Sequence, residues 1–325
     1  MTVLVTGAAG FIGMHVAAAL LARGEPVVGL DNLNGYYSTA LKEARLATLA
    51  GQSGFRFQAL DLAEDEALLR FTRAHPEIDR VIHLAAQPGV RYSVDHPRAY
   101  VSANLVAHLE VLEACRHLPK LTHLVYASSS SVYGGNTKLP FAIEDGVDRP
   151  QSLYAATKKA DELMSYSYAH LYKLPMTGLR FFTVYGPWGR PDMAPWLFTE
   201  AIIAGTPIKL FNHGKMRRDF TYIDDIVAGV IACLDKPPTA EMTPPYRLYN
   251  IGNSSSEELE RFVQILEDAI GRKATIERVP MPPGDIEATY ADITATVRDF
   301  GFVPRTAIAD GLPRFVAWYR DYHKV

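Results

Sequence analysis

The feature that most constrains the fold is a glycine-rich turn close to the start of the chain. A short β-rich run at 3–6 leads directly into this turn, and a helical pattern follows at 14–23. The turn contains Gly7, Gly10, Phe11, Ile12 and Gly13. Glycines at this spacing let the backbone approach a pyrophosphate, and the N-terminus of the helix offers unpaired N–H groups to its oxygens. The order of strand, turn and helix predicts a dinucleotide-binding unit, with a plain tight turn as the alternative.

Three further strands are expected at 26–30, 55–62 and 80–86, and their carboxyl ends carry residues that can contact a cofactor. These residues are Asp31 and Asn32, Asp61 and Leu62, and Leu84, Ala85 and Ala86. A carboxylate at Asp31 can accept hydrogen bonds from both ribose hydroxyls and would repel a 2′-phosphate, which favours NAD over NADP. The fourth strand also contains His83, which we interpret as a satisfied core histidine.

Strands alternate with helices as far as a strand expected at 176–182. This order predicts an α/β fold with a Rossmann-type doubly wound parallel sheet, whose ligands bind at the carboxyl ends of the strands. We expect residues 1–182, completed by the segment 219–250, to form the NAD-binding domain. The less regular remainder, 183–325, is expected to form mainly a smaller α/β lobe that binds the substrate.

Local patterns predict further elements within that outline. A helix is predicted at 97–117, carrying Asn104 as a further cofactor contact, and another from Tyr154 to about residue 171. A loop is expected at 183–195 and a helix at 256–270.

Charge and cysteine content exclude several classes of protein. The formal net charge of -3 gives no electrostatic reason to expect nucleic acid or an anionic membrane as a partner. Cys115 and Cys233 lie far apart and offer neither a disulfide framework nor a metal cluster, so we expect core thiols, no metal and a cytoplasmic location. The first apolar run has no basic region before it and is interrupted by glycines, which argues against a signal peptide or membrane span.

Tyr154 and Lys158 lie four residues apart on an expected helix, so their side chains share one face. A free tyrosine has a pKa near ~10, and a fixed neighbouring cation favours its phenolate, so this pair could take a proton from a hydroxyl. The same spacing is common on solvated helices, and alone it does not establish catalysis. The serine run 128–131 follows a strand expected at 122–127, where this architecture places its chemistry, although such runs most often form flexible turns.

Taken together, the segment 6–13, Asp31, Ser129, Tyr154 and Lys158 resemble the extended short-chain dehydrogenase/reductase superfamily over nearly the whole chain. Within it the chain looks most like the NAD-dependent nucleotide-sugar epimerases, and among these the UDP-glucuronate 4-epimerases. The segments 31–34, 87–93, 180–193 and 283–285 carry this closer likeness.

The resemblance implies a redox-neutral reaction on a UDP-sugar. Tyr154 would remove the proton of the sugar C4 hydroxyl while hydride passes from C4 to NAD. Lys158 would lower the pKa of the phenol and hold the nicotinamide ribose, and Ser129 would hydrogen-bond the same sugar oxygen. The 4-keto sugar would then turn over and take the hydride back on its other face, converting UDP-glucuronate into UDP-galacturonate.

Two sister reactions begin with the same oxidation. Similar 4,6-dehydratases carry an Asp-Glu pair where this chain has Ser130 and Ser131, and UDP-glucuronate decarboxylases carry a Glu at the position of Ser131. Hydroxyls without a base can orient a sugar but cannot readily drive elimination. The alternatives that stay open are a UDP-glucose/UDP-galactose 4-epimerase, a UDP-glucuronate decarboxylase, and a non-enzymatic NAD-sensing regulator of the same fold.

Residues near the sugar bear on this choice. A C4 ketone lies β to the C6 carboxylate, and such an acid loses carbon dioxide when the C5–C6 bond aligns with the carbonyl π system. Arg190 is suited to hold the carboxylate in a planar two-point grip, and Thr183 can add a hydroxyl donor. The alternative for Arg190 is an ordinary surface-loop arginine. UDP-galactose epimerases carry an Asn-Pro pair in place of Thr183-Val184, which fits a neutral substrate.

The resemblance also suggests how the nucleotide is held. Arg218 matches the arginine that family members use on the diphosphate. A second arginine of UDP-galactose epimerases is replaced by Pro282, and Arg91 is a candidate for its task. Asp285 either bonds a uridine ribose hydroxyl or caps its turn. In this family, helices such as those at 97–117 and 154–171 pair into a homodimer.

Overall fold

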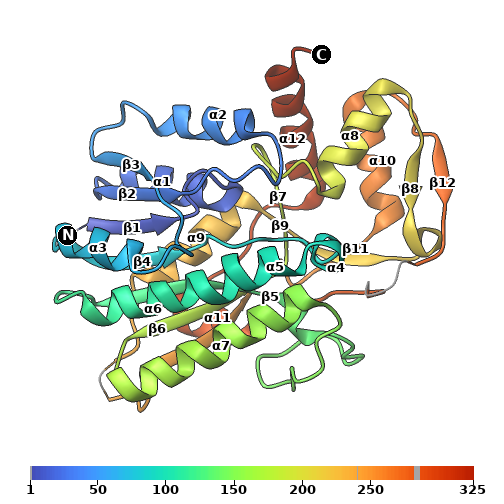
Figure 1. Cartoon of the computed structure of the whole chain (residues 1–325). Helices are drawn as coiled ribbons and strands as arrows, with labels where there is room; N and C mark the ends of the chain where they lie inside the picture. Colours follow the sequence, from blue (N-terminus) through green and yellow to red (C-terminus); the bar gives the residue numbers. More distant parts are fainter. Residues whose placement is uncertain (1, 240, 282–285) are drawn as a thin grey trace.

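The computed structural model describes residues 2–239, 241–281 and 286–325, so the contacts expected at Pro282 and Asp285 lie outside the described residues. Its centre is a seven-stranded parallel sheet with the order β10-β6-β5-β4-β1-β2-β3 (Figure 1). The strands are β1 (Thr2–Thr6), β2 (Val27–Asp31), β3 (Phe55–Ala59), β4 (Ile78–His83), β5 (His123–Ser129), β6 (Met176–Phe181) and β10 (Tyr246–Ile251). The predicted Rossmann-type α/β fold is confirmed.

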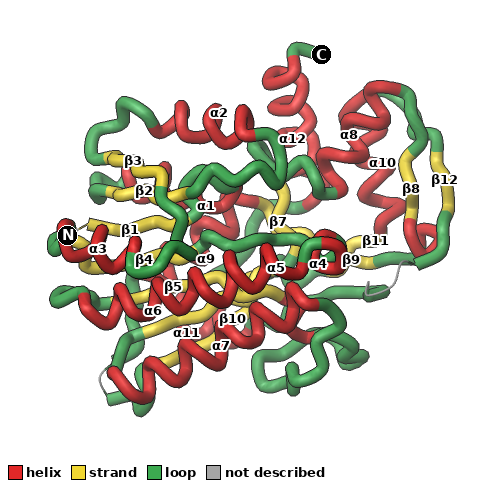
Figure 2. Tube along the Cα trace, viewed as in Figure 1, coloured by secondary structure: helices red, strands yellow, loops and turns green. Residues whose placement is uncertain are grey.

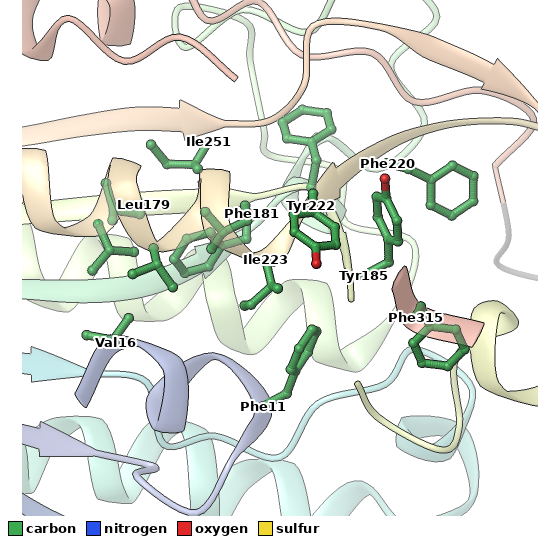
Figure 3. Close-up of a cluster of buried hydrophobic side chains, with 14 of the residues drawn as sticks. Phe11, Val16, Leu179, Phe181, Tyr185, Phe220, Tyr222, Ile223, Ile251 and Phe315 are labelled. Carbon is green, nitrogen blue, oxygen red and sulfur yellow. The ribbon is translucent and has the colours of Figure 1, made fainter. Parts of the chain in front are cut away.

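Helices cover both faces of this sheet because its strands are apolar on both faces. In β1, Val3 and Val5 belong to one buried cluster and Leu4 to the other. One layer contains α1 (Phe11–Ala22), α2 (Thr39–Leu49), α9 (Ile223–Leu234) and α11 (Thr294–Phe300); the other contains α3 (Ala67–Ala74), α5 (Pro97–Tyr100), α6 (Ala107–His117) and α7 (Leu153–Tyr172). Burial on both sides is the usual requirement of a parallel sheet. Figure 3 shows part of the first cluster, where Phe11 and Val16 of α1 face Leu179 and Ile223.

The second half of the chain adds a smaller group of elements at one side of the sheet (Figure 2). A three-stranded sheet has the order β11-β9-β7 and a two-stranded sheet pairs β12 with β8. The strands are β7 (Thr183–Tyr185), β8 (Ile208–Leu210), β9 (Arg217–Tyr222), β11 (Ser256–Glu258) and β12 (Ile276–Arg278), and the helices are α8 (Ala194–Ala204), α10 (Leu259–Ile270) and α12 (Ile308–His323). The short helical turns are α4 (Tyr92–Asp95), η2 (Ser130–Tyr133) and η3 (Phe211–Gly214).

Two local predictions are wrong because strand pairing overrides local pattern. The loop expected at 183–195 begins with β7, in which Thr183 pairs with Phe220. The helix expected at 256–270 begins only at Leu259, because Ser256–Glu258 pairs antiparallel with the start of β9. The sequence patterns also do not predict α2, α3 or α11.

The single helix expected at 97–117 is divided by a π-helical segment, η1 (Val101–Val106). One extra residue per turn rotates the side chains that follow, and such segments often occur near functional sites. Asn104 lies in this segment and is buried. The periodicity of apolar residues does not reveal the interruption, because it is a single-turn change in a continuous helix.

Other predictions about the core are confirmed. Cys115 and Cys233 are free, buried thiols, and burial raises the pKa of both. His83 is buried and its Nδ1 lies 2.8 Å from the Thr6 hydroxyl. Burial lowers the pKa of His83 well below its usual value, so the ring is neutral. In the described part of the chain, no helix has the length and apolar character needed to cross a membrane.

Candidate active site

A cleft of about 420 Å³ opens at the carboxyl ends of the strands. The connections after β1 and β4 lead to opposite faces of the sheet, which creates the crevice where ligands bind in such folds. The predicted site residues that line it are Gly7, Gly10, Phe11, Ile12, Gly13, Asp31, Asn32, Asp61, Leu62, Leu84, Ala85, Ala86, Ser129, Ser130, Tyr154, Lys158, Thr183, Arg190 and Arg218. The structure therefore gathers most of the predicted residues in one place.

The glycine turn fits a dinucleotide because it leaves no room for side chains. Gly7 has a φ of 72°, and a Cβ there would lie 2.8 Å from the backbone nitrogen of Ala85. A Cβ on Gly13 would lie 2.0 Å from the Gly7 carbonyl oxygen. The turn is thus packed tightly against the end of β4 and the start of α1, as a backbone cradle for phosphates requires.

Carboxylates at the ends of β2 and β3 line the end of the cleft where the sequence predicts the ribose. Asp31 accepts hydrogen bonds from the backbone N–H groups of Ala9, at 3.2 Å, and Leu33, at 2.9 Å. Asp61 accepts one from the Asn32 side chain at 3.1 Å. The carboxylate of Asp31 is therefore fixed beside the glycine turn, where its remaining lone pairs can accept from ribose hydroxyls.

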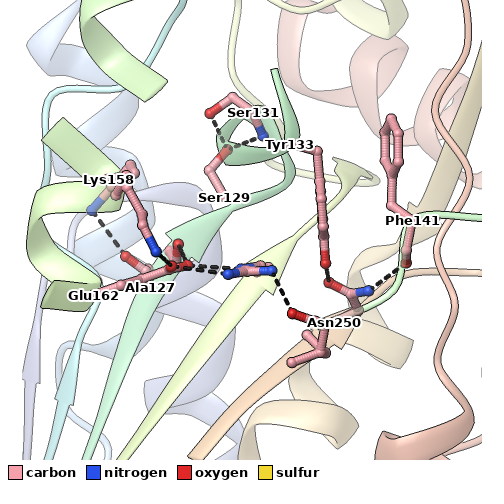
Figure 4. A network of polar contacts seen from close by, with 12 residues as sticks. Ala127, Ser129, Ser131, Tyr133, Phe141, Lys158, Glu162 and Asn250 are labelled. Atoms are coloured by element: carbon pink, nitrogen blue, oxygen red, sulfur yellow. Dashed lines mark hydrogen bonds and ion pairs between the residues drawn. The ribbon is translucent and has the colours of Figure 1, made fainter. Parts of the chain in front are cut away.

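At the opposite end, Ser129 is oriented by Ser131 (Figure 4). The Ser129 hydroxyl oxygen accepts from the Ser131 backbone N–H at 3.2 Å and from the Ser131 hydroxyl at 2.9 Å. A hydroxyl has two lone pairs and one proton. With both lone pairs engaged, Ser129 can only donate, which suits a group that holds a sugar oxygen.

The paired Tyr154 and Lys158 project from the first turns of α7, whose N-terminus is capped by the Ser152 hydroxyl. The Lys158 ammonium donates to the Ala127 carbonyl at 2.9 Å and to Asp161 at 3.1 Å, leaving its third N–H for the cleft. The Tyr154 ring packs edge-on against Tyr100. Within the described residues, the Tyr154 hydroxyl has no hydrogen-bond partner, so it is available to a ligand.

Charges beneath this pair are buried and compensated. Glu162, one turn after Lys158, accepts from Ser128 at 2.7 Å and from Arg180 at 2.8 Å and 3.0 Å. Burial raises the pKa of Asp161 to about 6, although Lys158 opposes the shift. Burial, and then Lys158, lower the pKa of His108 to about 3.

Arg190 reaches the cleft, but part of the predicted two-point grip is already in use. Its Nε and Nη2 atoms donate to the two Asp192 oxygens at 3.0 Å and 2.6 Å, and Tyr36 donates to Asp192 at 3.0 Å. Burial opposes ionisation of Asp192, yet the Arg190 guanidinium holds the pKa of that carboxyl below its usual range. The outer edge, made of Nη1 and the second Nη2 proton, stays as a two-point donor.

Three predicted contacts have different surroundings. Asn104 does not line the cleft; its amide bonds both backbone groups of Gln87 and the Thr157 hydroxyl, so it holds the loop after β4 against α7. Arg91 also lies outside the lining and stacks over the Phe211 ring at 4.3 Å. Arg218 lines the cleft and donates to the backbone carbonyls of Arg217 and Glu287.

Sequence reasoning missed a group of cleft residues in the loop after β2 and in the first turn of α2. They are Asn34, Tyr36, Tyr37 and Lys42. A polar and aromatic run directly after a strand that ends in Asp31 was the available signal, because strand ends hold ligands in this architecture. In the part of the chain that the structure describes, no cluster of three metal-ligating side chains is found.

The comparisons agree with this geometry. Residues 3–252 match the NAD dependent epimerase/dehydratase family. The chain belongs to this family. It is 47% identical to the probable UDP-glucuronate 4-epimerase of Rhizobium meliloti (strain 1021), over 100% of this chain and 98% of the relative. It is 48% identical to UDP-glucuronate 4-epimerase 4 of Arabidopsis thaliana, over 99% of this chain and 76% of the relative.

A solved structure gives the same picture. The structure of the UDP-glucuronic acid 4-epimerase of Bacillus cereus in complex with UDP-glucuronic acid and NAD is similar to that of this chain. The TM-score is 0.91 at 34% identity, and the match covers 99% of this chain and 100% of that chain. The predicted likeness to UDP-glucuronate 4-epimerases is therefore confirmed.

The raised pKa of Asp161 leads to a stability prediction. A carboxyl whose folded pKa exceeds its unfolded value stabilises the fold below the unfolded pKa, and this contribution is lost as the pH rises through about 6. Asn mimics the protonated form. The difference in unfolding free energy between Asp161→Asn and wild type should therefore increase in favour of the variant by about 1 kcal/mol as the pH rises from about 5 to about 7.5. Urea unfolding at both pH values measures this, and a difference that does not change with pH would contradict it.

Proposed function

We propose that the protein epimerises UDP-glucuronate at C4 to UDP-galacturonate through a transient 4-keto sugar, with NAD as its cofactor. The observation that carries this is the composition of the cleft. Ser129, Tyr154 and Lys158 lie in the same cleft as Arg190, whereas the acidic side chains among the described lining residues are Asp31 and Asp61, at the carboxyl ends of β2 and β3. The cleft thus holds the groups for oxidation at C4, and among its described lining residues no carboxylate that could promote elimination lies near the serines.

Each end of the cleft has its own task. The glycine turn and Asp31 bind the pyrophosphate and adenosine ribose, and Asn32, Asp61 and Leu62 lie where the adenine is expected. Phe11, Ile12, Leu84, Ala85 and Ala86 provide the apolar walls. When bound, NAD accepts hydride from C4 and returns it to the other face of the sugar.

The chain's own residues handle the proton and the sugar. Tyr154 takes the proton from the C4 hydroxyl and later returns it, and the Lys158 ammonium stabilises the negative charge that develops on the phenol oxygen. Ser129 donates to O4, because its lone pairs are already engaged by Ser131. Ser130 orients the sugar without supplying a base.

Other residues bind the C6 carboxylate and the nucleotide of the UDP-sugar. The free edge of Arg190 and the Thr183 hydroxyl bind the C6 carboxylate and keep the C5–C6 bond out of line with the C4 carbonyl. Arg218 binds the diphosphate. We assign residues 1–182, with the segment 219–250, to NAD binding and 183–325 mainly to the UDP-sugar, and we place the enzyme in the cytoplasm.

One observation favours a second candidate function, epimerisation of a neutral UDP-glucose or UDP-galactose. Asp192 already neutralises Arg190, so the cleft offers a carboxylate less net attraction than a free arginine would. Incubation of the purified protein with each UDP-sugar, followed by NMR of the products, distinguishes an epimer of the acid, an epimer of the neutral sugar, a pentose and no reaction. No C4 inversion of any UDP-sugar would instead favour an NAD-sensing regulator.

The role of Tyr154 is tested by removing only its hydroxyl. Tyr154→Phe should lower kcat for UDP-glucuronate about 1,000-fold, because the general base is lost while the ring contact with Tyr100 is kept. Tyr172→Phe, at the exposed end of the same helix, is the matched control and should retain activity. Substantial turnover by Tyr154→Phe would rule out the mechanism.

The role of Arg190 is tested through the products as well as the rate. Arg190→Gln should lower kcat/KM for UDP-glucuronate about 10- to 100-fold, the value of a charge-assisted hydrogen bond. The pentose from decarboxylation should also form a larger share of the product, because the carboxylate is less restrained. If both the rate and the pentose share stay unchanged, Arg190 does not hold the carboxylate.

We also propose a homodimer formed through η1, α6 and α7. Large apolar side chains are exposed on these neighbouring helices: Val101, Val106, Leu109, Leu163 and Tyr166. Burying them against a second copy would remove this apolar surface from water. Sedimentation velocity at micromolar concentration should give a dimer, and Leu163→Glu should shift it towards monomer; a wild-type monomer would refute this interface.

A further inference from the structure

Arg45 on α2 is a fully buried arginine, at 0% exposure, whose function the sequence does not suggest. Its five N–H donors make five hydrogen bonds: Nε and Nη2 with the Trp188 carbonyl, Nη2 with the Gly189 carbonyl, and Nη1 with the Ala9 carbonyl and the Tyr37 hydroxyl. No carboxylate of the described residues forms an ion pair with it. A buried cation held mainly by backbone carbonyls is unusual, because such a charge is normally paired.

These bonds join three segments that meet around the cleft. Ala9 belongs to the glycine turn, Tyr37 follows the strand that ends in Asp31, and Trp188 and Gly189 directly precede Arg190. The distances to the Trp188 carbonyl are 2.7 Å and 3.1 Å, and the distance to Gly189 is 3.1 Å. One side chain therefore connects the dinucleotide turn to the loop that carries the carboxylate-binding arginine.

The loop before Arg190 needs such support. Trp188 has a φ of 64°, in the left-handed region that residues with a side chain seldom adopt. Its indole packs against Trp318 and Tyr322 of α12, which fixes the loop from outside. Arg45 fixes the same loop from inside, because both carbonyls of the turn point to its guanidinium.

The same neighbouring segment also sets the direction of the Arg190 side chain. Tyr36 donates to Asp192, which holds the inner edge of the Arg190 guanidinium, while the adjacent Tyr37 bonds Arg45. The backbone of the loop before Arg190 and the Arg190 side chain are therefore both held in place by contacts with residues 36–45. A shift of this segment would move the free edge of Arg190 relative to the glycine turn.

We propose that Arg45 is a positioning residue for recognition of the sugar carboxylate. This role rests on the proposed function. Arg45 fixes the position of the Arg190 loop relative to the glycine turn. Arg45 does not line the cleft and acts only through the loop. Its removal should therefore affect UDP-sugars that carry a C6 carboxylate much more than UDP-sugars that lack one.

The test compares two ligands and two arginines. Calorimetry on the NAD-loaded protein should show that Arg45→Lys weakens UDP-glucuronate binding about 10-fold or more, whereas UDP-glucose binding changes less than about 3-fold. The pentose share of the product should rise, as for Arg190→Gln. The double variant should lose little more than Arg190→Gln alone, because residues that act through one another are not additive.

Controls separate this role from stability. Arg320→Lys alters another helical arginine that donates to a carbonyl, that of Ile270, and should leave both affinities unchanged. Arg45→Gln removes the charge at this position and should show the same selective loss of UDP-glucuronate binding as Arg45→Lys. Equal losses for both sugars, additive losses in the double variant, or failure of both Arg45 variants to fold and retain NAD would each overturn the proposal.

Comparison of wild type with Arg45→Lys separates the positioning role of Arg45 from the proposed function. If wild-type protein does not prefer UDP-glucuronate to UDP-glucose, the proposed function fails. If the preference exists and Arg45→Lys leaves it intact, only the positioning role fails.

Discussion

The placement of the reacting groups depends on one buried carboxylate, Glu162. It lies on α7, one turn after Lys158, and binds both Ser128 at the end of β5 and the Arg180 guanidinium on β6. One side chain thus ties the helix that carries Tyr154 and Lys158 to the strand residue directly before Ser129. Because breaking a buried pair leaves an uncompensated charge, at a cost of about 3–5 kcal/mol, the geometry of catalysis is tied to the stability of the sheet.

The cleft combines a general oxidation site with a specific sugar site. In the mechanism that we propose, Tyr154, Lys158 and Ser129 provide the oxidation at C4, which sister enzymes share. In the same proposal, the choice of product depends on the neighbouring lining residues: hydroxyls rather than carboxylates at Ser130 and Ser131, together with Arg190 and Thr183. Ser130 and Ser131 directly follow Ser129 in the sequence, whereas Thr183 and Arg190 come from a later part of the chain.

Sequence patterns predicted the elements that depend on local or repeated signals. The glycine turn, the carboxyl-end positions of Asp31 and Ser129, and the Tyr154 helix all follow from strand and helix order, and the structure places them in one cleft. The strands β7 and β11 and the contacts of Arg45 could not be predicted, because each depends on a partner distant in the sequence. The engagement of Arg190 by Asp192 was also missed, although the two residues are close neighbours, because spacing alone does not show which carboxylate an arginine meets.

The Asp192 contact has a consequence for the empty enzyme. An arginine exposed to a cleft without its own counterion would attract chloride and inorganic phosphate from the surrounding solution, and these ions would have to leave before a sugar acid could enter. A carboxylate supplied by the chain, 2.6 Å from Nη2, keeps the guanidinium neutralised and oriented between turnovers. The site then binds abundant small anions weakly and favours a ligand whose carboxylate is attached to a nucleotide.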